Sequence, residues 1–139
     1  MLNFVKVDFE QHVDKLFQLL NERKFTISHD KKTLFEEHSN FVKFHPYREW
    51  CLVEADSLLI GTFYITFENI ISINIVTDRK QWFPDVLKKI LVNYKPLKEI
   101  KSLRNKDFLI NCPIDDFELK EILKSSAFEE IQSTFKLVR

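Results

Sequence analysis

The sequence predicts a single α/β domain that spans residues 1–139. The first basis is size and composition, because 139 residues that are 45% hydrophobic can build one real core. The second is the order of patterns, in which segments of helical spacing flank a run of closely spaced β segments.

The balance of charged residues excludes one class of binding partner. Basic and acidic residues number 21 each, so there is no net basic field, and we expect no nucleic-acid partner.

The first third of the chain is predicted to form a strand followed by two helices. Residues 4–9 alternate weakly, which is typical of a short strand. Apolar residues at helical spacing predict a first helix over about 10–22 and a second over about 31–44, which Pro46 ends. The polar stretch 21–30 between them is expected to be a connection.

The middle of the chain has the strongest β pattern. Residues 50–54, 58–67 and 70–77 are rich in β-branched and aromatic side chains and are separated by short polar turns. The last of these segments alternates for most of its length, as a strand with unlike faces does. These observations predict a three-strand antiparallel meander.

The last third is predicted to contain a helix, a strand, a second helix and a terminal strand. A polar loop follows the meander, and Pro84 is expected in the first turn of the next helix. Residues 108–112 are expected to be a strand, and Asp115 with Glu118 forms a capping pair that opens the last helix. Apolar residues in 131–137 predict a terminal strand.

The cysteines and the hydropathy pattern indicate a soluble cytoplasmic protein with no membrane partner. Cys51 and Cys112 lie in apolar, strand-like runs and are expected to be buried free thiols in a reducing compartment, with a disulfide or a reactive thiol as alternatives. No segment approaches the roughly 18–20 apolar residues that cross a bilayer. Residues 1–10 lack the pattern of a signal peptide.

Glycine is unusually scarce. The chain has one glycine, Gly61, whereas average usage of about 7% would predict nearly ten. This excludes the dinucleotide-binding fingerprint and the Walker loop, which need several glycines to wrap the backbone around phosphates. A phosphate-binding loop in this chain is therefore either absent or built differently.

The histidines do not form a metal-binding pattern. His12, His29, His38 and His45 are scattered, and none has the spacing to a second histidine, glutamate or cysteine that a zinc site requires. We therefore expect no metal cofactor.

The order of the predicted elements and three local details resemble the GNAT family of acyl-CoA-dependent N-acyltransferases. Asp56-Ser-Leu-Leu-Ile-Gly61 is similar to the acidic turn, aliphatic pair and glycine of that family's third strand. Residues 70–77, with the polar loop and apolar helix after them, are similar to its fourth strand, coenzyme loop and third helix. Residues 108–128, ending in Ala127-Phe128, are similar to its next strand, polar helix start and closing Gly-Phe.

This resemblance implies an α/β (α+β) fold with a central mixed, mostly antiparallel sheet flanked by about four helices. It also implies that the fourth and fifth strands splay apart and hold the pantetheine arm of acetyl-CoA or another acyl-CoA. The pyrophosphate then lies on backbone N–H groups at the start of the following helix. The implied coenzyme-binding residues are Ile75, Val76, Thr77, Arg79, Lys80 and Gln81.

The sequence departs from the family at two points. The family's loop carries two glycines, but no glycine occurs between Val76 and Leu87, the interval is short, and Trp82 and Phe83 occupy it. Many relatives also place on the last helix a tyrosine that protonates the departing thiolate. Residues 122–128 contain no tyrosine.

Acyl transfer to an amine needs a group that takes up the amine's proton. Glu54 and Glu68 end strands of the meander and Tyr64 lies within one, so these three are the catalytic candidates. Surface-turn carboxylates and a core aromatic are the alternative interpretations. The resemblance places the acceptor site just before the meander, and the candidate acceptor-binding residues there are His45, Tyr47 and Arg48.

Two functional hypotheses follow. The first is an N-acetyltransferase that moves an acetyl or similar acyl group from acyl-CoA to a small-molecule amine. An amino sugar or nucleotide-sugar is the preferred acceptor, because His45-Pro-Tyr-Arg48 resembles relatives that acylate amino sugars. The alternative is a catalytically degenerate GNAT-fold binding or assembly module without CoA chemistry, with a homodimer as its natural form. An open slot between the strands beginning near Ile70 and Phe108 favours the first hypothesis, and a slot plugged by Trp82 or Phe83 favours the second.

Overall fold

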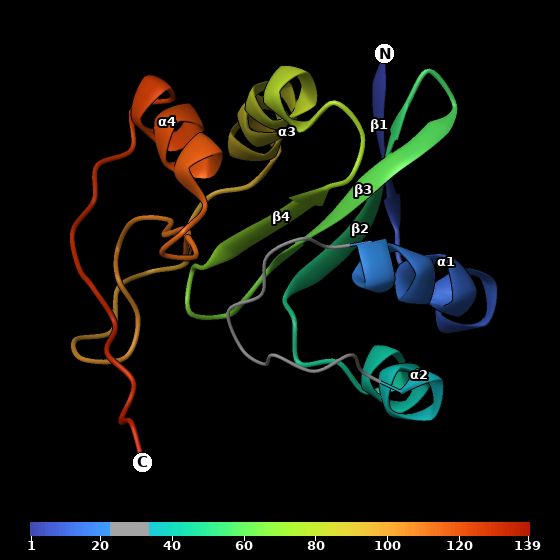
Figure 1. Ribbon diagram of the computed structural model, residues 1–139, viewed down its shortest axis with the longest axis horizontal. Helices are drawn as coiled ribbons and strands as arrows, with labels where there is room; N and C mark the ends of the chain where they lie inside the picture. Colours follow the sequence, from blue (N-terminus) through green and yellow to red (C-terminus); the bar gives the residue numbers. More distant parts are fainter. Residues whose placement is uncertain (23–33) are drawn as a thin grey trace.

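A sheet of four antiparallel strands in the order β1-β2-β3-β4 forms the centre of the fold (Figure 1). The computed structural model describes residues 1–22 and 34–139. In chain order the elements are β1 (Leu2–Lys6), α1 (Phe9–Glu22), α2 (Phe35–Lys43), β2 (Glu49–Ala55), β3 (Leu58–Ile65), β4 (Ile71–Ile75), α3 (Arg79–Asn93) and α4 (Phe117–Ser125). The predicted meander is confirmed as β2, β3 and β4.

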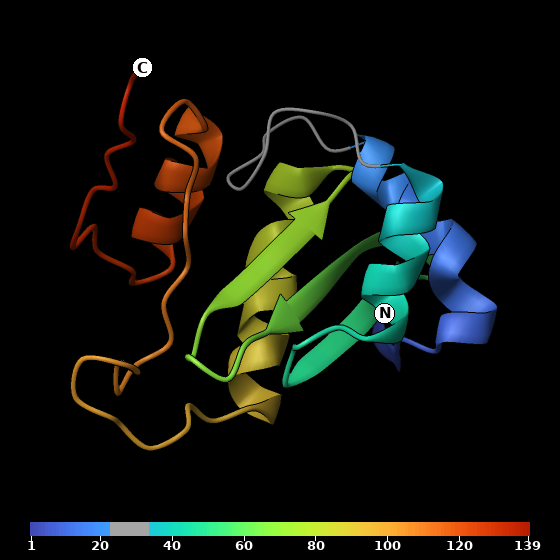
Figure 2. The ribbon, with the colours of Figure 1, turned by 90° about the horizontal axis from the view of Figure 1, so that it is seen from below.

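The helices cover the two faces of the sheet in pairs, α1 with α2 and α3 with α4 (Figures 1 and 2). Strand alternation produces this arrangement, because successive side chains of β2 point to opposite faces. Trp50 and Leu52 pack with Leu16 and Leu19 of α1 and with Val42 of α2. The larger core, on the α3/α4 face, includes Cys51, Val53, Phe63, Ile71, Phe83 and Ile90.

Helix α1 begins at a reciprocal cap. The Asp8 carboxylate accepts a hydrogen bond from the N–H of Glu10 at 3.0 Å, and the N–H of Asp8 donates to Nδ1 of His12 at 2.8 Å. Both bonds satisfy backbone or side-chain groups that would otherwise lie unpaired at the helix start. The predicted first helix is therefore confirmed, with one extra residue at its N-terminal end.

Gly61 lies where β3 approaches β4 most closely. It pairs with Ile75 in the register and follows a bulge in the β2–β3 ladder. A Cβ built on Gly61 would lie 2.2 Å from the carbonyl oxygen of Asn74 and 2.9 Å from Cδ1 of Ile75. The backbone of this residue has no positive φ, so the close approach is the reason for glycine here.

We expect Gly61→Ala to lower the free energy of unfolding by about 1–3 kcal/mol, because the added methyl group has to displace the backbone of β4. Urea unfolding followed by tryptophan fluorescence measures this change. Leu58→Ala, at the exposed end of the same strand, is the control and is expected to cost less than about 1 kcal/mol. A Gly61→Ala protein as stable as the parent would contradict the clash.

Helix α3 differs from its predicted form. It begins at Arg79, so Arg79, Lys80 and Gln81 form its first turn and not a loop, and Pro84 lies inside the helix. The chain turns directly into the helix at Asp78, which adopts a left-handed conformation with φ 47°. The missing N–H of Pro84 leaves the carbonyl of Lys80 without its helical partner, and Lys80 lies at the exposed side of the helix.

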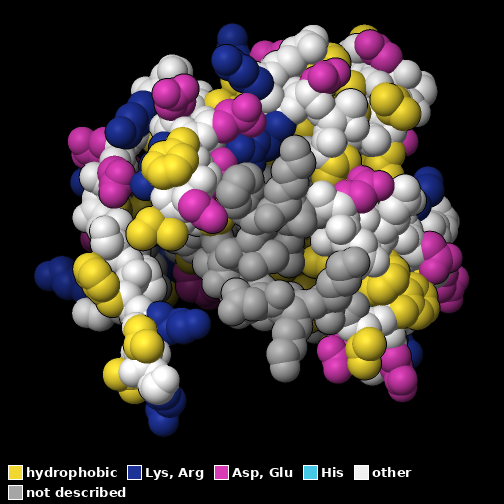
Figure 3. Space-filling view, viewed as in Figure 1, with side chains coloured by type: hydrophobic (Ala, Val, Ile, Leu, Met, Phe, Trp, Pro, Cys, Tyr) yellow, Lys and Arg dark blue, Asp and Glu magenta, His cyan; other side chains and the backbone are white. Residues whose placement is uncertain are grey.

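The C-terminal part also differs from the prediction. Residues 126–139 contain no strand, and residues 108–112 contribute a single β bridge in place of a strand. The apolar side chains of the predicted terminal strand are exposed, with Phe135 at 93%, and Figure 3 shows them along the extended C-terminal segment. A strand requires a hydrogen-bonding neighbour, and this segment has none among the described residues.

Two predictions reach into residues 23–33, which lie outside the described residues. The predicted connection 21–30 overlaps α1 at its first two positions and otherwise falls there. The second helix is confirmed from Phe35 to Lys43, and its expected start at residue 31 falls in the same range, as does His29. Within the described part of the chain, every helix is too short or too polar to cross a membrane.

Candidate functional site

Strand β4 and the segment after residue 107 meet at one point and then separate. The N–H of Leu109 donates to the carbonyl of Asn69 at 2.9 Å, and the N–H of Ile71 donates to the carbonyl of Leu109 at 2.8 Å. This parallel contact between Ile70 and Leu109 is the one bridge between the two segments in the described structure. Beyond it, the two backbones diverge toward Ile75 and Asp116.

The divergence leaves one edge of β4 open. In an antiparallel ladder, alternate residues direct both backbone groups to the same neighbour. Val76 donates its N–H to a β3 carbonyl at 2.9 Å, whereas Ile71 donates to Leu109 on the other side. By this alternation, Ile73 and Ile75 direct their N–H and C=O groups into the split, where no backbone group of the described residues pairs with them.

A cleft of about 1130 Å³ passes through this split. It is lined on the α1/α2 face of the sheet by side chains such as His38, Tyr47 and Tyr64. On the α3/α4 face it is lined by the start of α3, the start of α4 and Ile110. One cavity therefore reaches both faces of the sheet, and two molecules can meet in it at the open edge of β4.

The start of α3 points backbone donors toward the cleft. Asp78, the N-cap residue, makes no side-chain cap, and its carbonyl accepts hydrogen bonds from Gln81 and Trp82, both at 3.0 Å. The N–H groups of Arg79 and Lys80 come before these in the first turn, where the helix itself supplies no acceptor. Together with the helix dipole, they favour an anion at this end of the cleft.

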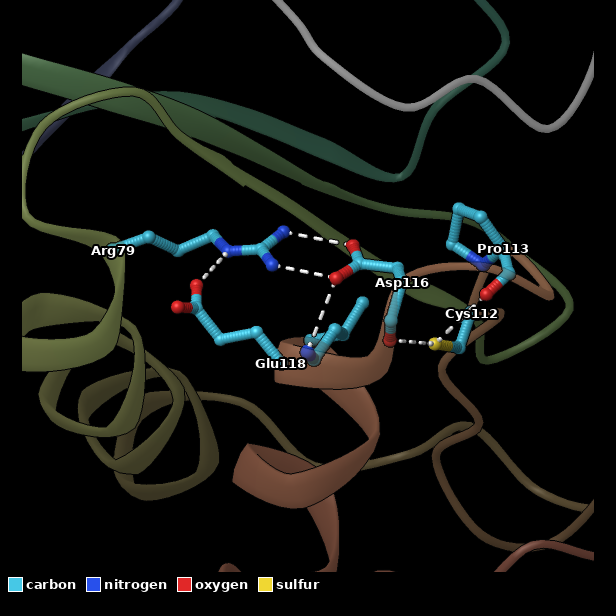
Figure 4. Close-up of polar contacts among 6 residues, drawn as sticks. Arg79, Cys112, Pro113, Asp116 and Glu118 are labelled. Atoms are coloured by element: carbon cyan, nitrogen blue, oxygen red, sulfur yellow. Dashed lines mark hydrogen bonds and ion pairs between the residues drawn. The ribbon is translucent and has the colours of Figure 1, made fainter.

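Arg79 joins α3 to the start of α4 (Figure 4). Its guanidinium donates to the two carboxylate oxygens of Asp116 at 2.6 and 2.8 Å and to Glu118 at 3.0 Å. Asp116 also caps α4 by accepting from the N–H of Leu119 at 3.1 Å. Burial acts to raise the pKa of the Asp116 carboxyl, but the hydrogen bonds from Arg79 and Leu119 and the charge of Arg79 outweigh it and lower that pKa.

Four of the six residues predicted to bind the coenzyme line the cleft: Ile75, Val76, Arg79 and Lys80. Thr77 and Gln81 do not line it. The N–H of Val76 is already bonded to β3, so Ile73, which was not predicted, provides the second open backbone position beside Ile75.

Of the predicted catalytic and acceptor-binding residues, some line the cleft and others lie outside it. Tyr64 and Tyr47 line the cleft and stack on each other with ring centroids 3.8 Å apart. Glu54 lies on β2 beside Asn3, and Glu68 lies in an exposed turn, so both are outside the cleft lining. His45 and Arg48 are also outside it. Nδ1 of His45 accepts from the N–H of Tyr47 at 3.1 Å, and Arg48 donates to the carbonyl of Lys95 at 3.0 Å.

The aromatic residues after β4 do not fill the split. Phe83 is buried and forms part of the cleft wall, and Trp82 is half-buried against the α3/α4 core and does not line the cleft. Because α3 begins at Arg79, both side chains belong to its first turns and pack beneath the sheet. Among the described residues, neither Trp82 nor Phe83 plugs the slot, which is the observation that distinguished the two functional hypotheses.

Besides Ile73, the cleft residues that were not predicted as site residues include His38, Asn74 and Asp116. His38 carried a signal, since it lies on the apolar stripe of the second predicted helix, but nothing local indicated that it would face a cavity. Asp116 was adjacent to the predicted capping pair, whose first member proves to be Asp116 in place of Asp115.

The cysteines are unsuited to nucleophilic chemistry. Both are free thiols, and Cys51 is buried. Burial, reinforced by the charge of Glu49, raises the pKa of the Cys51 thiol to about 11. Burial likewise raises the pKa of Cys112, with a further contribution from Asp116. No cluster of three or more His, Cys, Asp or Glu side chains that could hold a metal occurs in the described residues.

The sequence matches no protein-family model and no curated protein. Solved structures share the fold. A ribosomal-protein-alanine N-acetyltransferase from Brucella melitensis biovar Abortus 2308 has a TM-score of 0.68 and 10% identity, with 100% of both chains covered. An aminoglycoside 6'-N-acetyltransferase from Acinetobacter baumannii has a TM-score of 0.64 and 9% identity, covering 100% of this chain and 98% of that one.

A third solved structure is a ribosomal L7/L12 α-N-protein acetyltransferase in complex with coenzyme A. Its TM-score is 0.60 and its identity 16%, and the match covers 91% of this chain and 79% of that one. At such identities the three likenesses establish a common architecture for this chain and these N-acetyltransferases.

Proposed function

We propose that this protein, which has the fold of the GNAT N-acyltransferases, transfers an acyl group from an acyl-CoA to an amine. One observation carries the proposal. Strand β4 and the segment that begins at Phe108 are bridged only at Ile70 and Leu109, and the cleft passes through the gap beyond. An extended molecule with amide groups can occupy such an edge as an added strand does.

The described residues fit an acyl-CoA in part. The backbone of Ile73 and Ile75 would pair with the amides of the pantetheine arm. The N–H groups of Arg79 and Lys80 would meet the pyrophosphate at the start of α3. The fit is weaker in charge, because Asp78 lies at the same helix end and Arg79 is paired with two carboxylates.

The reaction itself requires little from the protein beyond positioning and proton transfer. The neutral amine attacks the thioester carbon, a C–N bond forms, and the C–S bond breaks. The amine gives up one proton in total, and the CoA thiolate takes up one as it leaves. The cleft brings both substrates to the open edge of β4, where the side chains of Tyr64 and His38 are in the lining.

The acceptor class is a separate question. The sequence resemblance implied an amino sugar or nucleotide-sugar, and one structural neighbour is named as an aminoglycoside acetyltransferase. Another neighbour is named as acting on a ribosomal protein. The proposal therefore covers a primary amine in general, and an amino sugar is one arm of the experiment described below.

A second candidate function is a binding or assembly module of the same fold without CoA chemistry. The pairing of Arg79 favours it, because a guanidinium held by Asp116 and Glu118 is less available to a phosphate. The absence of glycine after Gly61 favours it too, since the start of α3 has no flexible loop to close over the pyrophosphate.

Thermal unfolding with acetyl-CoA tests the proposal against this alternative. A ligand that binds the folded state stabilises it by RT ln(1 + [L]/Kd), which is about 2.7 kcal/mol at one hundred times Kd. We expect a saturable rise in Tm with acetyl-CoA, and thiol release when an accepted amine is added. An unchanged Tm at millimolar acetyl-CoA, together with a tight dimer in sedimentation, would support the assembly module instead.

We expect Glu118→Gln to strengthen acetyl-CoA binding by about two- to fivefold, since one partly exposed charge near a phosphate is worth roughly 0.5–1 kcal/mol. The change removes one of the two carboxylates that hold Arg79. Isothermal titration at low and high salt measures it, and the gain should shrink at high salt. Glu121→Gln, an exposed residue of the same helix outside the cleft lining, is the matched control. Equal affinity in both variants would contradict a phosphate near Arg79.

A further inference from the structure

The cleft has a wall of aromatic side chains on the α1/α2 face of the sheet. We define this aromatic wall as Phe41, Tyr47, Trp50 and Tyr64, all of which line the cleft. Tyr47 and Tyr64 are stacked 3.8 Å apart, and Trp50 meets Tyr47 edge-on at 5.1 Å. Phe41 packs edge-on against Tyr47 at 5.6 Å and remains 43% exposed. The wall is closely packed, largely aromatic and partly accessible.

Several polar groups in or beside this wall are occupied within the protein. Nε1 of Trp50 donates to Oγ1 of Thr62 at 3.1 Å, and that hydroxyl donates to the carbonyl of Cys51 at 2.6 Å. The amide of Asn74 donates to the carbonyl of Leu19 at 3.4 Å. A polyhydroxylated ligand needs many hydrogen bonds to replace its water, and these groups already have partners within the protein.

His38 is the exception. Its side chain lines the cleft beside the aromatic wall, and the residue is 6% exposed. Its Nε2 is buried and has no hydrogen-bond partner in the described structure. A buried polar atom without a partner costs free energy, so such an atom in a cleft wall marks where a ligand atom would be favourable. Burial also lowers the pKa of His38, which keeps the ring neutral and able to accept a hydrogen bond near pH 7.

We propose that the acceptor is a primary amine carried on an apolar, ring-bearing body, with the body against the aromatic wall and the amino group on Nε2 of His38. This inference rests on the proposed function and names its substrate class. An ammonium or amine N–H is the donor that a neutral Nε2 lacks, and an aromatic wall attracts a cation as well as a ring. His38 and Phe41 are thereby specificity-determining residues.

Amine binding without any acyl-CoA tests this inference independently of catalysis. The probes are 2-phenylethylamine and glucosamine, titrated into the full chain carrying Trp82→Phe, so that fluorescence reports on Trp50 alone. We expect saturable quenching by 2-phenylethylamine with a Kd at least about tenfold below that of glucosamine, because one ring–ring contact is worth roughly that factor. Equal or tighter binding of glucosamine overturns the inference, and so does the absence of saturable binding of either amine.

Two variants locate the site. Phe41→Ala and His38→Gln are each expected to weaken 2-phenylethylamine binding by about three- to tenfold. Phe44→Ala is the matched control, because Phe44 ends the same helix, is 75% exposed and lies outside the cleft lining. Circular dichroism and Tm show that each variant is folded. If Phe44→Ala weakens binding as much as Phe41→Ala, the aromatic wall is not the binding surface.

The same amines in a thiol-release assay separate this inference from the proposed function. Turnover of acetyl-CoA with glucosamine but not with 2-phenylethylamine leaves acyl transfer intact and overturns the acceptor class. Saturable 2-phenylethylamine binding at the wall, without any response to acetyl-CoA, supports the amine site and overturns the acyl transfer. With both intact, His38→Gln is expected to raise KM for 2-phenylethylamine and leave KM for acetyl-CoA unchanged.

Discussion

Replacing Asn69 by alanine is expected to lower the free energy of unfolding by about 3–5 kcal/mol. Asn69 is 0% exposed and follows the turn between β3 and β4. Its side-chain Nδ2 donates to the backbone carbonyls of Leu97 and Asn105, both at 2.8 Å. Its side-chain Oδ1 accepts from the N–H of Leu97 at 2.8 Å. Alanine removes these three part-buried hydrogen bonds, and each contributes roughly 1–1.5 kcal/mol.

The left-handed backbone of Asn69, with φ 67°, provides a matched comparison. Asn69→Gly removes the same hydrogen bonds and tolerates this φ, so it should be about 1 kcal/mol more stable than Asn69→Ala. Asn69→Asp keeps the acceptor and loses both donated bonds. Urea unfolding measures all three, and a loss of less than about 1 kcal/mol in Asn69→Ala would show that the contacts are not stabilising.

Asn69 also affects the cleft, because its backbone carbonyl accepts a hydrogen bond from the N–H of Leu109 where β4 and the later segment meet. The side chain holds the segment around Leu97 and Asn105, which leads into residues 108–112. We therefore expect Asn69→Ala to weaken acetyl-CoA binding even at a temperature where the variant is folded. Normal affinity for acetyl-CoA in the folded variant would mean that the contact between Ile70 and Leu109 forms without this side chain.

Asp116→Ala is expected to cost about 3–4 kcal/mol. Asp116 is 2% exposed, and its removal takes two hydrogen bonds from Arg79 and the cap from α4. Breaking a buried ion pair by removing one partner typically costs 3–5 kcal/mol, and Arg79 is partly exposed, which favours the lower end. Asp116→Asn retains a side-chain acceptor for the Leu119 N–H and should lose about 1 kcal/mol less.

The same carboxyl makes stability depend on pH. The pKa of Asp116 is lower in the folded protein than in the unfolded chain, so the unfolded chain binds the proton more readily. The contribution of Asp116 is fully present above its unfolded pKa of about 3.9 and is lost as pH falls through the lower folded value. Unfolding free energies between pH 6 and pH 3 should therefore converge for the parent and Asp116→Asn. Parallel curves over this range would contradict the assignment.

Local patterns predicted most of the elements. The alternation of β-branched and aromatic residues in 50–77 was sufficient for the meander, because strand side chains alternate whatever the strand packs against. The resemblance to the GNAT family added the split, and in the described structure a single bridge, at Ile70 and Leu109, joins the two segments. The predicted terminal strand 131–137 is wrong, since an alternating pattern states which face would be buried and not whether a neighbouring strand exists.

Only part of the candidate site was predicted, because local patterns do not show which segments become neighbours in the fold. Positions in or next to β4, such as Ile75 and Arg79, were implied by the resemblance to the GNAT family and do line the cleft. Glu54 and Glu68 were predicted as catalytic candidates because they end strands. Strands end, however, at several places around a sheet. Only one of these places borders the split.

By itself, the sequence determined most of the order of elements and the balanced charge, which depend on local spacing or on composition. The requirement for glycine at position 61 comes from the close approach of β4 and belongs to the tertiary structure. The tertiary structure alone decided that Arg79 is held by Asp116, 37 residues away, and that Nε2 of His38 lies in the cleft wall without a hydrogen-bond partner among the described residues. Such contacts form between helices and strands from distant parts of the chain. Their partners are set by how the backbone packs across the sheet, and no periodicity within one element carries that information.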